Sequence, residues 1–126
     1  MVNKFTFIDL FAGIGGFHLA LEQLGGRCVF ASEIDLAAQR IYVQNHLPGT
    51  EATMHGDIIA LSEPSVSPEV PPHDLLAAGF PCQPFSKGGQ QNGINESRGT
   101  LFFNIAKIIS ERKPKYFVLE NVRNPV

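Results

Sequence analysis

The stretch "KFTFIDLFAGIGGFHLALEQLG", residues 4–25, decides the fold class of this chain. Residues 4–11 are rich in β-branched and aromatic side chains, which predicts a buried strand. A glycine-rich turn follows. Residues 16–25 then place apolar side chains at helical spacing before a terminal glycine, which predicts a helix. Strand, glycine turn and helix in this order are typical of an α/β protein with a parallel sheet.

The same alternation continues along the chain. Further strands are expected at 27–35, 52–58 (a weak one), 74–80 and 115–122, and further helices at 36–46 and 100–113. The segment "SEPSVSPEVPPHD", residues 62–74, is rich in proline and serine and predicts a loop without core-forming residues. The fold class is therefore α/β, with helices on both faces of the sheet and a ligand site beyond the carboxyl ends of the strands.

Composition excludes several other classes. The chain has 126 residues, of which 44% are hydrophobic and 17% charged, which suits one globular domain with its own core. Two distant cysteines do not make a disulfide framework, so a reducing, cytoplasmic-type compartment is expected. No apolar run approaches the roughly 20 residues of a membrane span. No metal is expected, because the histidines lack ligand spacing and are assigned to the surface or to helices: His18, His46, His55 and His73.

Charge is distributed unevenly. Residues 1–86 carry three basic and nine acidic side chains (net −6), and residues 87–126 carry seven basic and three acidic (net +4). A basic final third suits a phosphate-bearing partner. Cations near the end of the predicted helix 100–113 also favour the helix dipole, and charge alone favours this second interpretation: Lys107, Arg112, Lys113 and Lys115.

Residues with chemical potential gather at predicted strand ends. The glycine turn would let a ligand approach the backbone, but a dinucleotide fingerprint needs glycine where His18 stands, so a nucleotide-like ligand and a simple tight turn both remain open. Glu33 could accept hydrogen bonds from ribose hydroxyls or supply helix N-terminal charge, a role that Asp35 could also fill. Asp57 could accept from an adenine amino group or end a turn.

Cys82 and Glu120 form the sharpest pair, each at the end of a predicted strand. A thiolate can add to an electron-poor ring carbon, and a carboxylic acid can protonate the ring nitrogen that takes up the charge. The alternatives are a buried core cysteine and an ion pair of Glu120 with Arg98 or Arg123. Prolines on both sides of Cys82, in "GFPCQPFS" (79–86), favour a rigid loop that presents a nucleophile.

The motifs "DLFAGIGG", "SEID", "GDI", "GFPCQPFS", "RGTLFFNIAKII" and "LENV" occur in the order and spacing of one family. Over nearly its whole length the sequence resembles the C5-cytosine-specific DNA methyltransferases, most closely the HhaI-type bacterial modification enzymes. "FPC" stands where amino-methyltransferases carry a "PP[YF]" motif. The resemblance implies a Rossmann-like class I S-adenosylmethionine-dependent methyltransferase fold, with a mostly parallel sheet that is incomplete at the C-terminus.

The resemblance also implies roles for individual residues. Cys82 would attack C6 of a cytosine flipped out of duplex DNA, Glu120 would engage N3, and residues 86–99 would close over the base. S-adenosyl-L-methionine would be held by Asp9, Phe11, Gly13, Glu33, Ile34, Asp57, Ile58, Pro81 and Leu101. The implied setting is the bacterial cytoplasm at the nucleoid, in a restriction-modification system.

The family continues beyond the point where this sequence stops. We therefore expect residues 1–126 to be the N-terminal part of the catalytic domain, without the target-recognition domain and the C-terminal segment that completes the cofactor pocket. Strand 115–122 would then have an unpaired edge. Methylation would need the missing C-terminal half or a complementing subunit. The alternatives are a tRNA cytosine-5 methyltransferase and a non-catalytic cofactor-binding or assembly subunit of a split enzyme.

Overall fold

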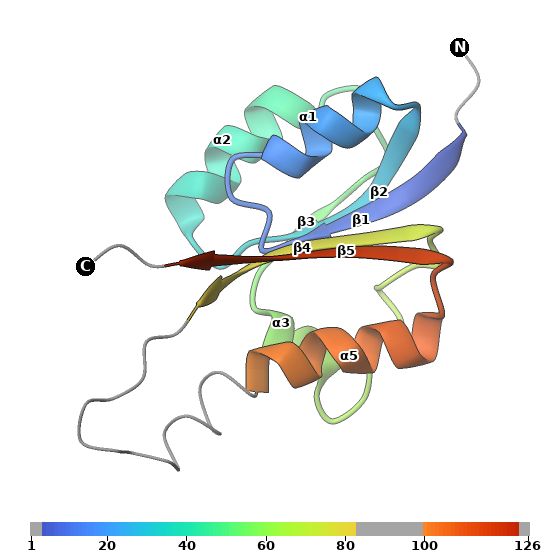
Figure 1. Cartoon of the computed structure of the whole chain (residues 1–126). Helices are drawn as coiled ribbons and strands as arrows, with labels where there is room; N and C mark the ends of the chain where they lie inside the picture. Colours follow the sequence, from blue (N-terminus) through green and yellow to red (C-terminus); the bar gives the residue numbers. More distant parts are fainter. Residues whose placement is uncertain (1–3, 83–99, 124–126) are drawn as a thin grey trace.

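Five parallel strands form one sheet in the order β3–β2–β1–β4–β5 (Figure 1). The computed structural model describes residues 4–82 and 100–123, without the side chains of Cys82, Thr100, Val122 and Arg123. The strands are β1 (Phe5–Leu10), β2 (Gly26–Ser32), β3 (Met54–His55), β4 (Leu75–Cys82) and β5 (Tyr116–Arg123). The helices are α1 (Gly16–Gln23), α2 (Leu36–His46), α3 (Ile58–Ser62) and α5 (Thr100–Arg112). The predicted α/β fold with parallel strands is confirmed.

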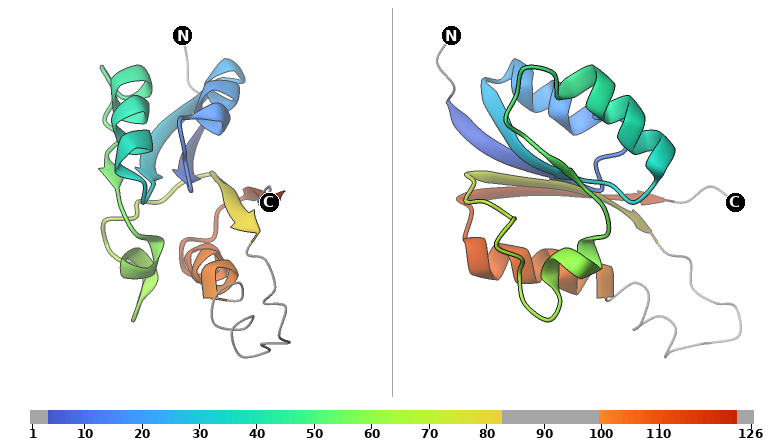
Figure 2. Two further views of the ribbon diagram at one scale, coloured as in Figure 1. Left: turned by 90° about the vertical axis from the view of Figure 1, so that its left-hand side faces the viewer. Right: turned by 180° about the vertical axis from the view of Figure 1, so that it is seen from behind.

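The helices cover the two faces of the sheet in pairs. Helices α1 and α2 lie on one face, and α3 and α5 lie on the other (Figures 1 and 2). Ile8 and Leu10 of β1 pack with Ile105 of α5, whereas Phe7 packs with Leu21 of α1. Central parallel strands are buried on both sides in this way, which is why β1 reads as a continuous apolar run. Thr6 and Asp9 are the polar residues of β1, and Asp9 is fully buried.

The loop between β3 and β4 differs from the prediction. Residues 58–62 form helix α3, and Val66 and Val70 of the predicted coreless loop are buried in the main core. Arg112 of α5 holds this loop, because its guanidinium donates to the carbonyl oxygens of Val70 (2.7 Å) and Ser67 (2.8 Å). Single valines among prolines and serines carry no periodic signal, which is why the sequence does not predict their burial. The contacts with Arg112 come from an element distant in the sequence.

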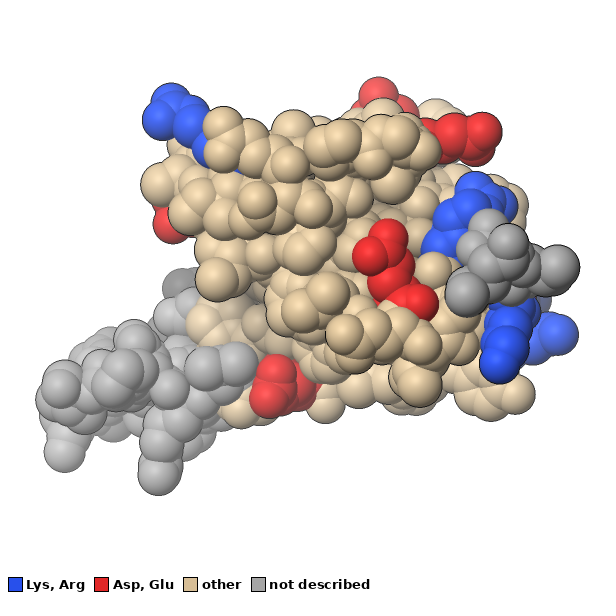
Figure 3. Space-filling model, turned by 90° about the horizontal axis from the view of Figure 1, so that it is seen from above, with Lys and Arg blue, Asp and Glu red and all other residues tan. Residues whose placement is uncertain are grey.

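Two of the four cations near the end of α5 therefore stabilise the fold by donating hydrogen bonds to the loop between β3 and β4. Besides Arg112, Lys107 donates to the carbonyl oxygen of Pro64 (2.8 Å) and lies 3.3 Å from a Glu63 carboxylate oxygen. On the opposite face, which α1 and α2 cover, Lys and Arg side chains stand at the margins, and Asp and Glu side chains lie between them (Figure 3). These contacts favour the structural interpretation of the charges on α5.

Strand β5 has a hydrogen-bonded neighbour on one side only, β4, within the described sheet. Tyr116 and Phe117 are 65% and 54% exposed, and Val118 is also exposed. The predicted edge position of strand 115–122 is thus confirmed for the described residues. Within the same residues, no helix is both long and apolar enough to cross a membrane.

Candidate active site

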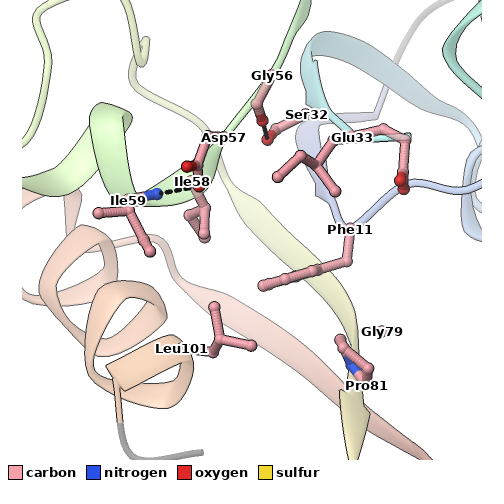
Figure 4. Close-up of a pocket in the computed structure, with 11 residues that line it drawn as sticks. Phe11, Ser32, Glu33, Gly56, Asp57, Ile58, Ile59, Gly79, Pro81 and Leu101 are labelled. Atoms are coloured by element: carbon pink, nitrogen blue, oxygen red, sulfur yellow. Dashed lines mark hydrogen bonds between the residues drawn. The ribbon is translucent and has the colours of Figure 1, made fainter. Parts of the chain in front are cut away.

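A pocket of about 520 Å³ opens at the carboxyl ends of the strands (Figure 4). Its volume lies within the usual range for small-molecule sites, roughly 300–1,000 Å³. Most of the residues that the resemblance assigned to a cofactor belong to its lining; Asp9 and Gly13 do not. The lining consists of Phe11, Ser32, Glu33, Ile34, Gly56, Asp57, Ile58, Ile59, Gly79, Pro81 and Leu101.

The glycine turn shapes one wall of this pocket. Phe11 has φ 54°, which is unusual for a residue with a side chain, and Gly13 (φ 58°) and Gly15 (φ 103°) also adopt left-handed conformations. This backbone lets the Phe11 ring extend across the pocket toward Leu101 (Figure 4). A non-glycine residue is held in that region only where its surroundings impose it, which is typical of binding sites.

Glu33 is oriented by two backbone hydrogen bonds. Its Oε1 accepts from the N–H of Gly13 (2.7 Å), and its Oε2 accepts from the N–H of Asp35 (2.9 Å). Each oxygen keeps a lone pair for a further donor such as a hydroxyl group. Asp35 itself caps α2 by accepting from the N–H of Ala37 (3.1 Å), so the role of helix cap belongs to Asp35 rather than to Glu33.

Asp57 begins helix α3 and also lies at the pocket. Its Oδ1 accepts from the N–H of Ile59 (2.9 Å) and so caps α3, and the residue also lines the pocket. Ser32 holds the backbone directly before Asp57 by donating to the carbonyl oxygen of Gly56 (2.7 Å). The predicted strand 52–58 ends early, at His55, because Asp57 begins a helix.

The side chain of Asp9 lies outside the pocket. It is fully buried toward α1 and α2, where Oδ2 is hydrogen-bonded to Tyr42 Oη over 3.0 Å and Oδ1 has no hydrogen-bond partner among the described residues. Burial raises the pKa of Asp9 to about 7. The predicted contact between this side chain and a cofactor therefore has no support in the geometry.

Two histidines are buried rather than on the surface. His18 lies in helix α1, as predicted, but it is fully buried there, and His73 is only 7% exposed and outside the helices, contrary to the predicted surface or helix position. Nδ1 of His18 lies 2.7 Å from the hydroxyl of Tyr42, which compensates for the loss of water. The sequence reasoning missed both residues of this pair. The available signal was helical spacing, since position 18 shares a helix face with the buried Leu21.

The two predicted catalytic residues lie on neighbouring strands. Glu120 of β5 is paired in register with Gly79 of β4, and its Oε1 lies 3.5 Å from where a Cβ of Gly79 would stand. Cys82 is three residues further along β4, roughly 10 Å of strand. Because β4 runs through Cys82, this residue belongs to a strand and not to the predicted loop. Pro81 is tolerated there because β4 has passed the end of β1 and has only β5 beside it.

Several predictions fall outside the described residues. They concern the side chain of Cys82, the role of Pro84, the segment 86–99 and the alternative ion pairs of Glu120 with Arg98 or Arg123. In the described part of the chain, no three His, Cys, Asp or Glu side chains gather into a group that could hold a metal ion.

A parallel sheet with a glycine turn, an oriented carboxylate and a pocket at its carboxyl edge defines a Rossmann-like α/β protein. The family model for C-5 cytosine-specific DNA methylases matches residues 5–126, and the chain belongs to this family.

Relatives with curated names agree with this assignment. The chain is 52% identical over 118 residues to the type II methyltransferase M.HhaI of Haemophilus parahaemolyticus, covering 94% of this chain and 34% of that protein. It is 53% identical over 121 residues to M.DsaV of Dactylococcopsis salina, covering 96% and 32%. The crystal structure of the Dnmt2 methyltransferase of S. pombe superposes with a TM-score of 0.68 at 31% identity, covering 94% and 36%. The chain thus spans about a third of the length of the curated relatives that it matches.

Proposed function

We propose that this chain forms the cofactor-binding and catalytic part of a DNA cytosine-5 methyltransferase that uses S-adenosyl-L-methionine. The observation that carries the proposal is the position of the pocket. It lies at the carboxyl edge of the sheet and includes Gly79 and Pro81 of β4, beside the β4 and β5 positions of Cys82 and Glu120. The family assignment supplies the reaction class. The setting we propose is the bacterial cytoplasm, where duplex DNA is available.

The residues of the pocket fit an adenosyl group. Phe11, Ile58 and Leu101 offer apolar walls for a flat base, and Ile34, which is 68% exposed, stands at the rim. The oriented carboxylate of Glu33 suits a pair of ribose hydroxyls. Asp57, across the pocket, keeps acceptor capacity for an amino group. Bound there, S-adenosyl-L-methionine supplies an electrophilic methyl group.

The chain's own residues activate the base in this proposal. The Cys82 thiolate forms a bond to C6 of cytosine, and the displaced electron pair is accommodated as N3 takes a proton from Glu120. C5 thereby becomes nucleophilic. After methylation, a solvent base takes the C5 proton, the Cys82–C6 bond breaks to release the thiolate, and N3 returns its proton to Glu120, which restores the aromatic ring. The cytosine must leave the duplex for this contact, because C6 is inaccessible inside the stack.

Isothermal titration of the longest polypeptide that contains this chain with S-adenosyl-L-methionine tests the pocket assignment. We expect saturable binding by the wild-type protein and a loss of about 10–100-fold in affinity for Glu33→Gln, because hydrogen bonds to a charged acceptor contribute roughly 1.5–3 kcal/mol. Glu51→Gln is the matched control, since the Glu51 side chain is 91% exposed and lies outside the pocket. Binding that is absent in the wild type, or equal in the Glu33 and Glu51 variants, would contradict the assignment.

A further inference from the structure

A chain of buried polar side chains lies behind the glycine turn, on the α1/α2 face of the sheet. Tyr42 Oη is 3.0 Å from Asp9 Oδ2 and 2.7 Å from His18 Nδ1. His18 Nε2 lies 3.2 Å from Glu22 Oε2, a close electrostatic contact whose geometry is not that of a hydrogen bond among the described residues. Asp9, Tyr42 and His18 are fully buried, whereas the Glu22 side chain is 45% exposed. This Asp9 network (Asp9, Tyr42, His18 and Glu22) therefore connects the centre of the fold with the surface.

The Asp9 network contacts the turn that shapes the pocket. Asp9 precedes Phe11 by two residues at the end of β1. His46 of α2 stacks on the His18 ring (centroids 4.6 Å apart), and its Nε2–H donates to the carbonyl oxygen of Ile14 (2.9 Å). The His46 ring also occupies the space that a side chain on Gly15 would need. The turn is thus held by Glu33 on the pocket side and by this cluster on the other.

Hydrogen counting allows two arrangements of the Asp9 network. With an ionised Asp9, the Tyr42 hydroxyl donates to it, so His18 must donate from Nδ1 and needs a second hydrogen for Glu22. His18 is then a buried imidazolium. With a protonated Asp9, each donor shifts along the chain. Asp9 donates to Tyr42, Tyr42 donates to Nδ1, and the hydrogen on Nε2 faces the Glu22 carboxylate. Both arrangements hold the same number of protons, and only the second leaves Asp9 and His18 uncharged.

Burial favours the uncharged arrangement near neutral pH. It raises the pKa of Asp9 to about 7 and lowers the pKa of His18. The hydrogen bond from Tyr42 opposes burial by lowering the pKa of Asp9, but burial is the larger effect. The Glu33 carboxylate, at the end of β2, raises the pKa of Asp9, and burial keeps the Cys28 thiol, 3.8 Å from Tyr42 Oη, protonated by raising its pKa to about 11.

Loss of the Asp9 proton breaks the network at its far end. An ionised Asp9 draws the Tyr42 hydrogen, and a neutral His18 then keeps its hydrogen on Nδ1. Its Nε2 turns a lone pair toward the Glu22 carboxylate, which repels it. Deprotonation therefore loosens the contact between β1, α1 and α2 directly behind the turn.

We propose that Asp9, Tyr42 and His18 are positioning residues of the ligand pocket, and that the hydrogen-bonded Asp9 network fixes the glycine turn in its ligand-binding shape. The inference rests on the proposed function for the identity of the ligand. In this proposal Asp9 supports the pocket without contacting the ligand. The affinity for the ligand therefore falls as pH rises through neutrality.

The Tyr42→Phe variant tests the proposal, with Tyr116→Phe as a matched control, because Tyr116 is exposed on β5 far from the network. Calorimetric titration with S-adenosyl-L-methionine is repeated from pH 6 to pH 8.5, and the titration of the ligand itself cancels between variants. We expect wild type and Tyr116→Phe to lose affinity about tenfold across this range. Tyr42→Phe should bind about tenfold more weakly at pH 6 and show no such step. Tyr42→Phe profiles that coincide with those of Tyr116→Phe would overturn the proposal.

A second measurement needs no ligand. In carbon-13 NMR of the wild-type protein, the Asp9 carboxyl should titrate near neutral pH, and the His18 ring nitrogens should change hydrogen in the same step. In Tyr42→Phe the two titrations should separate. An Asp9 carboxyl that titrates near its ordinary pKa, or independently of His18, would overturn the network, whereas absent ligand binding with an intact coupled titration would overturn only the proposed function.

Discussion

The free energy of unfolding of Asp9→Asn, compared with that of the wild type, should increase as pH rises through neutrality. The carboxyl group is fully buried, and among the described residues its hydrogen-bond partner is the Tyr42 hydroxyl, 3.0 Å from Oδ2. Desolvation raises its pKa from 3.8 to about 7. Asparagine has nearly the same shape as the protonated acid, but it cannot ionise.

The magnitude follows from the shift of the pKa. A change of about three units corresponds to about 4 kcal/mol, at roughly 1.4 kcal/mol for each unit. The folded-state pKa lies above the unfolded-state pKa, so the stability contributed by the protonated group is fully present below pH 4 and is lost as pH rises through 7. Between pH 5 and pH 8 the wild type should therefore lose about 3 kcal/mol that Asp9→Asn keeps.

Urea unfolding at pH 5, 6, 7 and 8 measures this difference. The carboxamide of Asp9→Asn adds a cost in its buried site, but that cost does not change with pH. Asp35→Asn serves as the control, because asparagine also caps helices and the position is exposed. A gap between wild type and Asp9→Asn that stays constant within about 1 kcal/mol across the range would refute the reasoning about burial.

Two further predictions concern single side chains. Asp57→Ala and Asp35→Ala remove equivalent helix caps and should each cost about 1 kcal/mol in urea unfolding, but only Asp57→Ala should also weaken binding of S-adenosyl-L-methionine in calorimetry, because only Asp57 lines the pocket. Equal affinities of the two variants would remove Asp57 from the site. Lys113 follows α5 at φ 51°, and its N–H donates to the carbonyl oxygen of Ile109. Lys113→Gly should therefore raise the free energy of unfolding by about 1 kcal/mol in thermal unfolding, because glycine adopts this backbone conformation without strain. A loss of stability would show that the lysine side chain outweighs the backbone strain.

The elements and the pocket could be predicted because their signals are local. Strand, turn and helix follow one another within residues 4–25, and parallel order then brings the strand ends to one edge. Glu33 and Asp57 were predicted from their places after strands, and both line the pocket. Sequence alone left each of them with two roles. The structure assigns the cap of α2 to Asp35 and shows Asp57 both as a cap and in the pocket.

The features that sequence reasoning missed depend on contacts between distant segments. Tyr42 and His18 are 24 residues apart, and only the packing of α2 beside α1 brings them together. A buried histidine and aspartate have the same sequence pattern as exposed ones until their partner is known. The buried valines of the loop 62–74 are a similar case, since Arg112 holds them from another element. The prediction that Asp9 holds the cofactor has the same origin, because the sequence does not show that the Asp9 side chain is buried against Tyr42.

Covalent trapping tests the central claim most directly. The longest polypeptide that contains this chain is incubated with S-adenosyl-L-methionine and duplex DNA carrying 5-fluorocytosine, whose C5 fluorine cannot be eliminated, and the products are digested and mapped by mass spectrometry. The account predicts a stable protein–DNA adduct on Cys82 that is absent in Cys82→Ser. No adduct on DNA, an adduct on another residue, or trapping only with tRNA would contradict it.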